Sequence, residues 1–153
     1  MTHDELIKRG ANWLKNNQVS VMRFPIILME MGSYAKSIPD VIGMNHARTA
    51  VIECKASRAD YQADQKKMHR HHRNQLGNHR YYLCPAGMLS PHEVNSGWGL
   101  LYCHPHKITI EKESEVFTDT REEEYHVMYS IIRRLMAYDL HDKTLKMLRA
   151  NKW

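Results

Sequence analysis

Residues 37–55 hold the pattern that most limits how this chain can fold. Two short apolar runs, Val41-Ile42 and Ala50-Val51-Ile52, stand on either side of a polar segment. Short β-branched runs joined by a polar connection favour two strands that pair as a hairpin. Asp40 begins the first run and Glu53 ends the second, so a hairpin would bring the two carboxylates to one edge of a sheet.

Lys55 lies two positions after Glu53. Side chains alternate between the two faces of a strand, so Glu53 and Lys55 share one face and Cys54 points to the other. Two carboxylates that lie close together repel one another, and a divalent cation is one group that relieves this repulsion. The pattern therefore predicts a metal site that is built from Asp40 and Glu53, with Lys55 beside it.

These residues resemble a known signature. Pro39-Asp40, followed by Glu53-Cys54-Lys55 at the end of an apolar run, is similar to the PD-(D/E)xK motif of the restriction-endonuclease-like nuclease superfamily. Three longer strings resemble its small MmcB-like branch, which is linked to DNA repair: IECKASRADYQADQKK, GNHRYYLCPAG and GWGLLYC. The resemblance runs roughly from Ile38 to Cys103.

The resemblance implies an α/β fold with a restriction-endonuclease-like core. Its central mixed sheet would be flanked by helices in the order αβββαβ, followed by a β-hairpin and C-terminal helices. The implied activity is Mg²⁺-dependent hydrolysis of DNA phosphodiester bonds, in DNA repair or in the processing of phage or mobile-element DNA, and Mn²⁺ could substitute for Mg²⁺.

The same resemblance assigns roles to the residues of the motif. Asp40 and Glu53 would bind the metal, with the backbone carbonyl of Cys54 as a third ligand. A water molecule activated by the metal would attack the phosphate. Lys55 would orient that water or stabilise the charge that grows on the phosphate.

Members of the superfamily often carry a further carboxylate at the metal site, and two residues are candidates. Glu5 lies three residues after Thr2, which is the spacing of a capping box, and the helix that it opens should run to about Asn16. Capping is the simpler interpretation of Glu5. Glu30 ends a predicted strand over Ile26–Glu30, as Glu53 ends its own strand, and it could equally face solvent.

Apolar spacing and turn residues predict the remaining elements. Strands are expected over residues 40–44, 50–56, 80–84, 98–104 and 107–112, and helices over residues 57–74 and 121–151. In the last helix, helical spacing relates five apolar residues that we expect to face the core: Tyr125, Met128, Ile132, Leu135 and Met136.

The formal net charge is +5, and the positive charge is not evenly spread. Residues 57–80 contain six Lys or Arg, four His and two Asp, whereas residues 111–124 contain seven acidic and two basic residues. A basic segment next to an acidic metal site favours DNA as the partner, although a merely solvated basic face is the alternative. The residues expected to contact DNA are Lys36, Arg58, Lys66, Lys67, Arg70 and Arg73.

Length and composition are those of one domain over residues 1–153. No apolar stretch is long enough to cross a membrane, and the first residues lack the apolar run of a signal peptide. The three cysteines, Cys54, Cys84 and Cys103, are expected to be reduced core thiols of a cytoplasmic protein. A homodimer is possible by analogy with nucleases that pair to cut both strands.

Two other interpretations remain open at this stage. The chain could be a DNA-binding accessory protein of the same fold in which catalysis is weak or absent. Alternatively, Asp40, Glu53 and Lys55 could form a surface ion-pair cluster on an α/β domain of another function, where such pairs contribute little stability.

The predicted role of the basic segment can be tested with Arg70→Ala combined with Arg73→Ala. We expect weaker DNA binding and a flatter salt dependence, because each lost phosphate contact lowers the slope of log K against log salt by about one. Fluorescence anisotropy over a salt series measures both quantities. An unchanged affinity would remove this segment from the DNA-binding surface.

Overall fold

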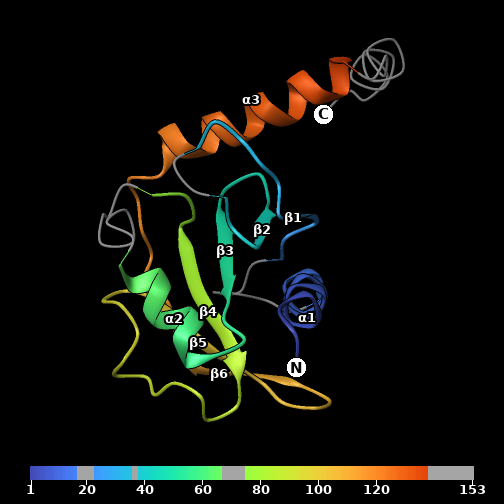
Figure 1. Cartoon of the computed structure of the whole chain (residues 1–153). Coiled ribbons are helices and arrows are strands. Elements are labelled where there is room, and N and C mark those ends of the chain that lie inside the picture. The colour runs from blue at the N-terminus through green and yellow to red at the C-terminus, as the bar shows by residue number, and fades with distance from the viewer. Residues whose placement is uncertain (17–22, 36–37, 67–74, 138–153) are drawn as a thin grey trace.

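A computed structural model of the chain describes residues 1–16, 23–35, 38–66 and 75–137. Within these residues the elements are α1 (His3–Asn16), β1 (Ile26–Met29), β2 (Val41–Met44), β3 (Thr49–Cys54), α2 (Arg58–Gln65), β4 (His79–Pro85), β5 (Gly99–Cys103), β6 (Ile108–Lys112) and α3 (Arg121–Ala137) (Figure 1). The chain is an α/β protein. Residues 67–74 and 138–151 of the predicted helices lie outside the described residues.

The six strands form one mixed sheet in the order β1-β2-β3-β4-β5-β6. β1, β2 and β3 are antiparallel neighbours, β3, β4 and β5 are parallel, and β6 pairs antiparallel with β5. Parallel neighbours require a crossover connection, and α2 lies in the one between β3 and β4. The predicted αβββαβ order and the hairpin that follows it are therefore confirmed.

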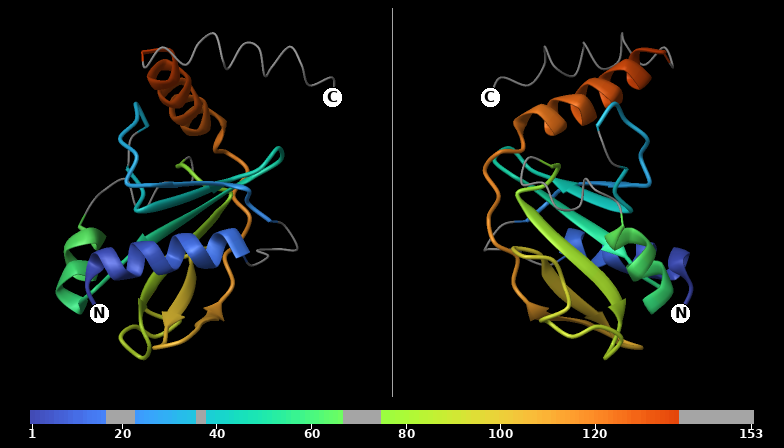
Figure 2. Two further views of the ribbon diagram at one scale, coloured as in Figure 1. Left: turned by 90° about the vertical axis from the view of Figure 1, so that its right-hand side faces the viewer. Right: turned by 60° about the vertical axis from the view of Figure 1, so that its left-hand side comes forward.

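β3 lies in the middle of the sheet, and all six of its residues are buried. Its Ile52 belongs to the core between the sheet and α1, together with Leu6 and Leu14 of that helix. On the opposite face, Val51 packs in a cluster with Val127 of α3. Figure 1 shows the sheet between α1 and α2, and Figure 2 shows α3 across the end of the sheet that is opposite the β5–β6 turn.

Local hydrogen bonds explain where the elements begin. The backbone N–H of Thr2 donates to Glu5 Oε2 at 2.8 Å, and that of Glu5 donates to Thr2 Oγ1 at 3.2 Å, which is the predicted capping box of α1. Ser57 caps α2 by accepting from the backbone N–H of Asp60. In the β2–β3 turn, Asn45 Oδ1 accepts from two backbone N–H groups of the turn.

The three cysteines are free and buried, in agreement with the sequence-based expectation of core thiols. Burial raises the pKa of Cys84 to about 11 and also raises that of Cys103. These thiols therefore stay protonated at neutral pH. Among the described helices, none combines the length and apolar character that a membrane crossing requires.

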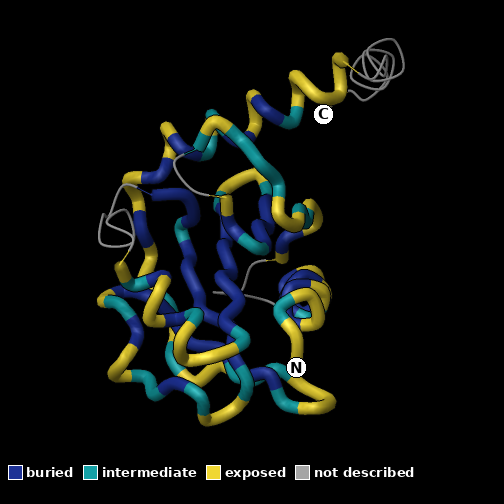
Figure 3. Tube along the Cα trace, in the orientation of Figure 1, coloured by how far each residue is buried: buried dark blue, intermediate teal, exposed yellow. Residues whose placement is uncertain are grey.

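The apolar stripe of α3 is exposed, so the expectation that it faces the core was wrong (Figure 3). The exposed side chains are Tyr125, Met128, Tyr129, Ile132, Leu135 and Met136. The residues that α3 buries are instead Glu123, Val127 and Ser130, which are spaced by four and three positions. Helical spacing identifies faces of a helix, but only the docking of α3 on residues 32–35 and the sheet decides which face is covered.

The two faces of α3 should differ in their contribution to stability. Val127 is 2 % exposed and Ile132 is 53 % exposed. We expect Val127→Ala to lower the free energy of unfolding by roughly 2 kcal/mol, and Ile132→Ala to change it by less than about 0.5 kcal/mol. Urea unfolding measures both. An equal loss for Ile132 would mean that another surface covers this face of α3.

Candidate functional site

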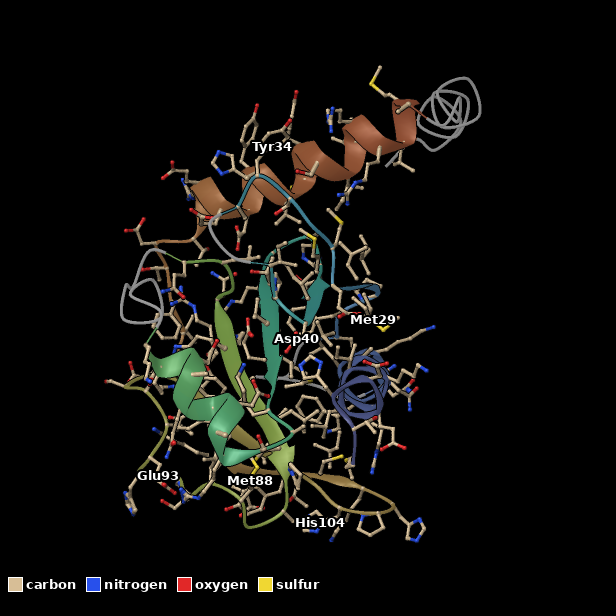
Figure 4. The ribbon with its side chains drawn as sticks, viewed as in Figure 1. Met29, Tyr34, Asp40, Met88, Glu93 and His104 are labelled. Atoms are coloured by element: carbon tan, nitrogen blue, oxygen red, sulfur yellow. The ribbon has the colours of Figure 1, made fainter. Side chains whose placement is uncertain are left out.

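Asp40 lies at the end of the β2–β3 pair where the two strands separate. The register pairs Val41 with Ile52, so Asp40, one residue earlier, lies opposite Glu53, one residue later. Asp40 Oδ2 accepts a hydrogen bond of 2.6 Å from the backbone N–H of Cys54 (Figure 4). The carboxylate of Asp40 is therefore fixed beside the end of β3, as the sequence pattern predicted.

Glu53 and Lys55 are close together at the carboxyl end of β3. Lys55 Nζ is 3.8 Å from Glu53 Oε2 and 3.5 Å from Asp64 Oδ1. All three residues are buried, with Glu53 3 %, Lys55 4 % and Asp64 1 % exposed. A buried ammonium is costly unless carboxylates lie close to it. The Lys55 ammonium has such partners in Glu53 of β3 and Asp64 of α2, and these contacts join the two elements.

Asp64 is a residue of the site that the sequence pattern did not assign to it. It belongs to α2 and contacts Lys55, which lies just after β3. Tyr82 of β4 donates its hydroxyl to Asp64 Oδ2 at 3.4 Å, and Gln65 and Asn95 donate to the same hydroxyl. The available signal was the position of Asp64 on a helix that begins directly after the ExK strand.

Cys54 contributes only its backbone to the site. Its side chain packs in the α1 core, and its pKa is raised by burial first and then by the carboxylates of Asp40 and Glu53. A thiol in these surroundings stays protonated, so it is neither a nucleophile nor a thiolate ligand. The carbonyl oxygen remains the group that could bind a cation.

The two candidates for an additional acid are placed differently. Glu5 is held in the capping box of α1, and hydrogen bonding to the backbone of Thr2 is the largest cause of its lowered pKa. Glu30 lies opposite Asp40 in the sheet, and its backbone N–H donates to Asp40 O at 3.0 Å. Its φ of 45° is in the left-handed region, which is unusual for a residue with a side chain.

His3 also reaches the site, and no sequence signal indicated it. Its Nε2 atom lies 3.4 Å from Asp40 Oδ2. His3 is the first residue of α1, so this contact ties the start of the helix to the end of the β2–β3 pair. Asp40 thus has contacts with both β3 and α1.

The described residues partly cover the predicted DNA contacts. Arg58 is exposed, and both of its terminal nitrogens donate to Glu93 Oε1, at 2.7 and 2.6 Å. Lys66 is exposed at the end of α2. The other four predicted contacts lie outside the described residues: Lys36, Lys67, Arg70 and Arg73.

The donor atoms at this end of β3 are compatible with Mg²⁺. This ion prefers oxygen ligands and is commonly held by one or two carboxylates together with water, which matches Asp40 and Glu53. In the part of the chain that the structure describes, no cluster of three or more His, Cys, Asp or Glu side chains is placed to hold a metal. A cation here would therefore depend on two carboxylates, the Cys54 carbonyl and water.

Comparisons with known proteins indicate the fold but no function. No protein-family model and no curated protein matches the chain. A solved structure of a protein of unknown function from Silicibacter pomeroyi is similar, with a TM-score of 0.61 and 21 % sequence identity. The similarity covers 91 % of this chain and 92 % of that one, and at this identity it concerns the fold alone.

The buried contact between Lys55 and Asp64 can be measured by a double-mutant cycle. Lys55→Met removes the ammonium from beside the buried carboxylates of Glu53 and Asp64, so we expect it to destabilise the fold by about 3 kcal/mol or more. Asp64→Asn should cost less, and the double variant should cost at least about 1 kcal/mol less than the sum of the single changes. Urea unfolding gives the three values.

The exposed pair of Arg58 and Glu93 provides the matched control for this cycle. Its coupling should be much weaker, because solvent screens an exposed ion pair. Additive effects of Lys55→Met and Asp64→Asn would contradict the buried contact.

Proposed function

We propose that the chain is a Mg²⁺-dependent nuclease of the PD-(D/E)xK type, with a restriction-endonuclease-like core, that hydrolyses DNA. The observation that carries this proposal is the position of Asp40 opposite Glu53 at the carboxyl end of β3. Lys55 lies two positions after Glu53 in the chain, and its ammonium is beside the Glu53 carboxylate. The sequence resemblance and the αβββαβ order of the elements support the same assignment.

The proposed roles follow from the chemistry of these side chains. Asp40 and Glu53 would hold the ion, with the carbonyl of Cys54 as a further ligand. A bound Mg²⁺ would supply Lewis-acid activation of water and of the phosphate. Lys55 would stabilise the negative charge that develops on the phosphate, and its fixed position reduces the reorganisation needed during the reaction.

Asp64 is a positioning residue in this proposal. It contacts Lys55 Nζ from α2, and the hydroxyl of Tyr82 contacts its other oxygen. A charged side chain that is held from two sides keeps one orientation. Asp64 would therefore keep the Lys55 ammonium beside Glu53.

One observation favours a second candidate, an accessory DNA-binding protein of the same fold with weak or absent catalysis. Glu53 and Lys55 are 3 % and 4 % exposed, and the Lys55 ammonium is held between two carboxylates. A cation that carboxylates already neutralise attracts a phosphate less strongly than a solvent-facing one. This candidate would bind DNA and leave it intact.

A cleavage assay separates the two candidates. Labelled single-strand, duplex, flap and four-way-junction DNA would be incubated with Mg²⁺, Mn²⁺ or EDTA. We expect cleavage with either metal and none with EDTA. Asp40→Asn and Glu53→Gln should each lower the rate at least about a hundredfold, because each removes one carboxylate ligand.

Glu122→Gln is the matched control, since Glu122 is an exposed carboxylate on α3, across the far end of the sheet. It should leave the cleavage rate unchanged. Binding of these DNAs without any cleavage would favour the accessory protein. Cleavage that persists in EDTA or in Glu53→Gln would contradict the proposed metal site.

A further inference from the structure

A groove runs between the exposed side of α1 and the turn that joins β5 to β6. It contains a cavity of about 310 Å³, lined by Arg9, Asn12, Trp13, Asn16, His106, Lys107 and Ile108. A second cavity of about 520 Å³ shares Arg9 with the first and continues the groove along Glu5, Lys8 and Pro105. We call the two cavities together the α1 groove.

The charge of the α1 groove is positive. Lys8, Arg9 and Lys107 line it, and none of them forms an ion pair with a carboxylate among the described residues. The acidic residue of its lining is Glu5, whose carboxylate accepts from the backbone of Thr2 and also interacts electrostatically with Arg9, so the lining holds three cations against one carboxylate. Arg58, in contrast, is already paired with Glu93. The groove therefore presents cations whose charge is available to an anion.

The floor and rim of the groove are held in place by contacts on the protein side. Trp13 is 8 % exposed and packs edge-on against Tyr81, with ring centroids 6.3 Å apart. Arg9 Nη2 donates to Lys107 O at 3.4 Å, which uses one of the five N–H donors of the guanidinium. Asn16 Nδ2 donates to the carbonyl and the side chain of Asn12.

The α1 groove lies at the same end of the sheet as the candidate active site. β3, β4 and β5 are parallel, so the β5–β6 turn follows the same end of the sheet at which Glu53 and Lys55 lie (Figure 1). Figure 4 places His104, the first residue of this turn, beyond the tip of β4. α1 links the two places, because His3 contacts Asp40 and Arg9 contacts Lys107.

We propose that the α1 groove binds the phosphodiester backbone of the DNA strand whose scissile phosphate lies at Asp40 and Glu53. The proposal rests on the proposed nuclease function. An arginine fork and a lysine ammonium suit phosphate oxygens, and such contacts position a strand without reading its sequence. Arg9 lies six positions after His3 in α1, which is a rise of about 9 Å along the helix axis. This rise corresponds to on the order of three nucleotides.

The test compares two double variants that remove the same charge. Arg9→Gln with Lys107→Gln removes two cations of the groove. Lys112→Gln with Arg121→Gln removes two cations at the other end of β6 and at the start of α3. Affinity for a fluorescent 20-nucleotide DNA single strand and for its DNA duplex would be measured in EDTA from 50 to 200 mM salt. Circular dichroism would check that the variants are folded.

We expect the groove variant to bind at least about tenfold more weakly at low salt, with a slope of log K against log salt that is smaller by about two. The control variant should keep the slope of the wild type, and Arg9→Lys alone should keep most of the affinity because it retains the charge. Equal losses in both double variants, or no loss in the groove variant, would overturn the proposal.

The outcomes also distinguish this proposal from the proposed function. If the wild type cleaves DNA and the groove variant binds as well as the wild type, the groove proposal fails and the nuclease stands. If the wild type binds DNA without cleaving it and the groove variant loses affinity, the groove stands and the nuclease fails. A wild type that binds no DNA at any salt concentration overturns the groove proposal.

Discussion

The buried ammonium of Lys55 is the constraint on which the centre of this structure depends. It lies between Glu53 of β3 and Asp64 of α2, and all three residues are buried. A charge in such surroundings requires close partners, so the end of β3 and the body of α2 must keep one relative position. The parallel register pairs Glu53 with Tyr82, whose hydroxyl contacts Asp64, and this brings β4 into the same network.

Asp40 approaches the same strand end from the other neighbour. Its carboxylate accepts a hydrogen bond from the backbone N–H of Cys54. At the point where β2 and β3 separate, this side chain therefore takes the place of a backbone carbonyl as the acceptor. His3 contacts this carboxylate from α1, whereas Asp64 approaches from α2 on the opposite face. Carboxylates therefore connect the carboxyl end of β3 to α1 on one face of the sheet and to α2 on the other.

Two surfaces of the molecule, the exposed face of α3 and the α1 groove, were not predicted from the sequence. The apolar stripe of α3 is exposed, since the helix docks through Val127 and Ser130. The cations that line the α1 groove come from residues 8–9 and 107, which are about a hundred positions apart and belong to no charge cluster in the sequence. Only the antiparallel return of β6 and the crossing of α1 bring them together.

The sequence by itself determined the strand pair around Asp40 and Glu53, the capping box of α1, and the order of the elements. These features depend on side-chain alternation, capping hydrogen bonds and turn residues, which act over a few positions. The tertiary structure decided that Asp64 and His3 join the site, that Glu5 stays in its cap, and which face of α3 is covered. Those outcomes depend on contacts between segments far apart in the chain, and local spacing does not specify how such segments dock.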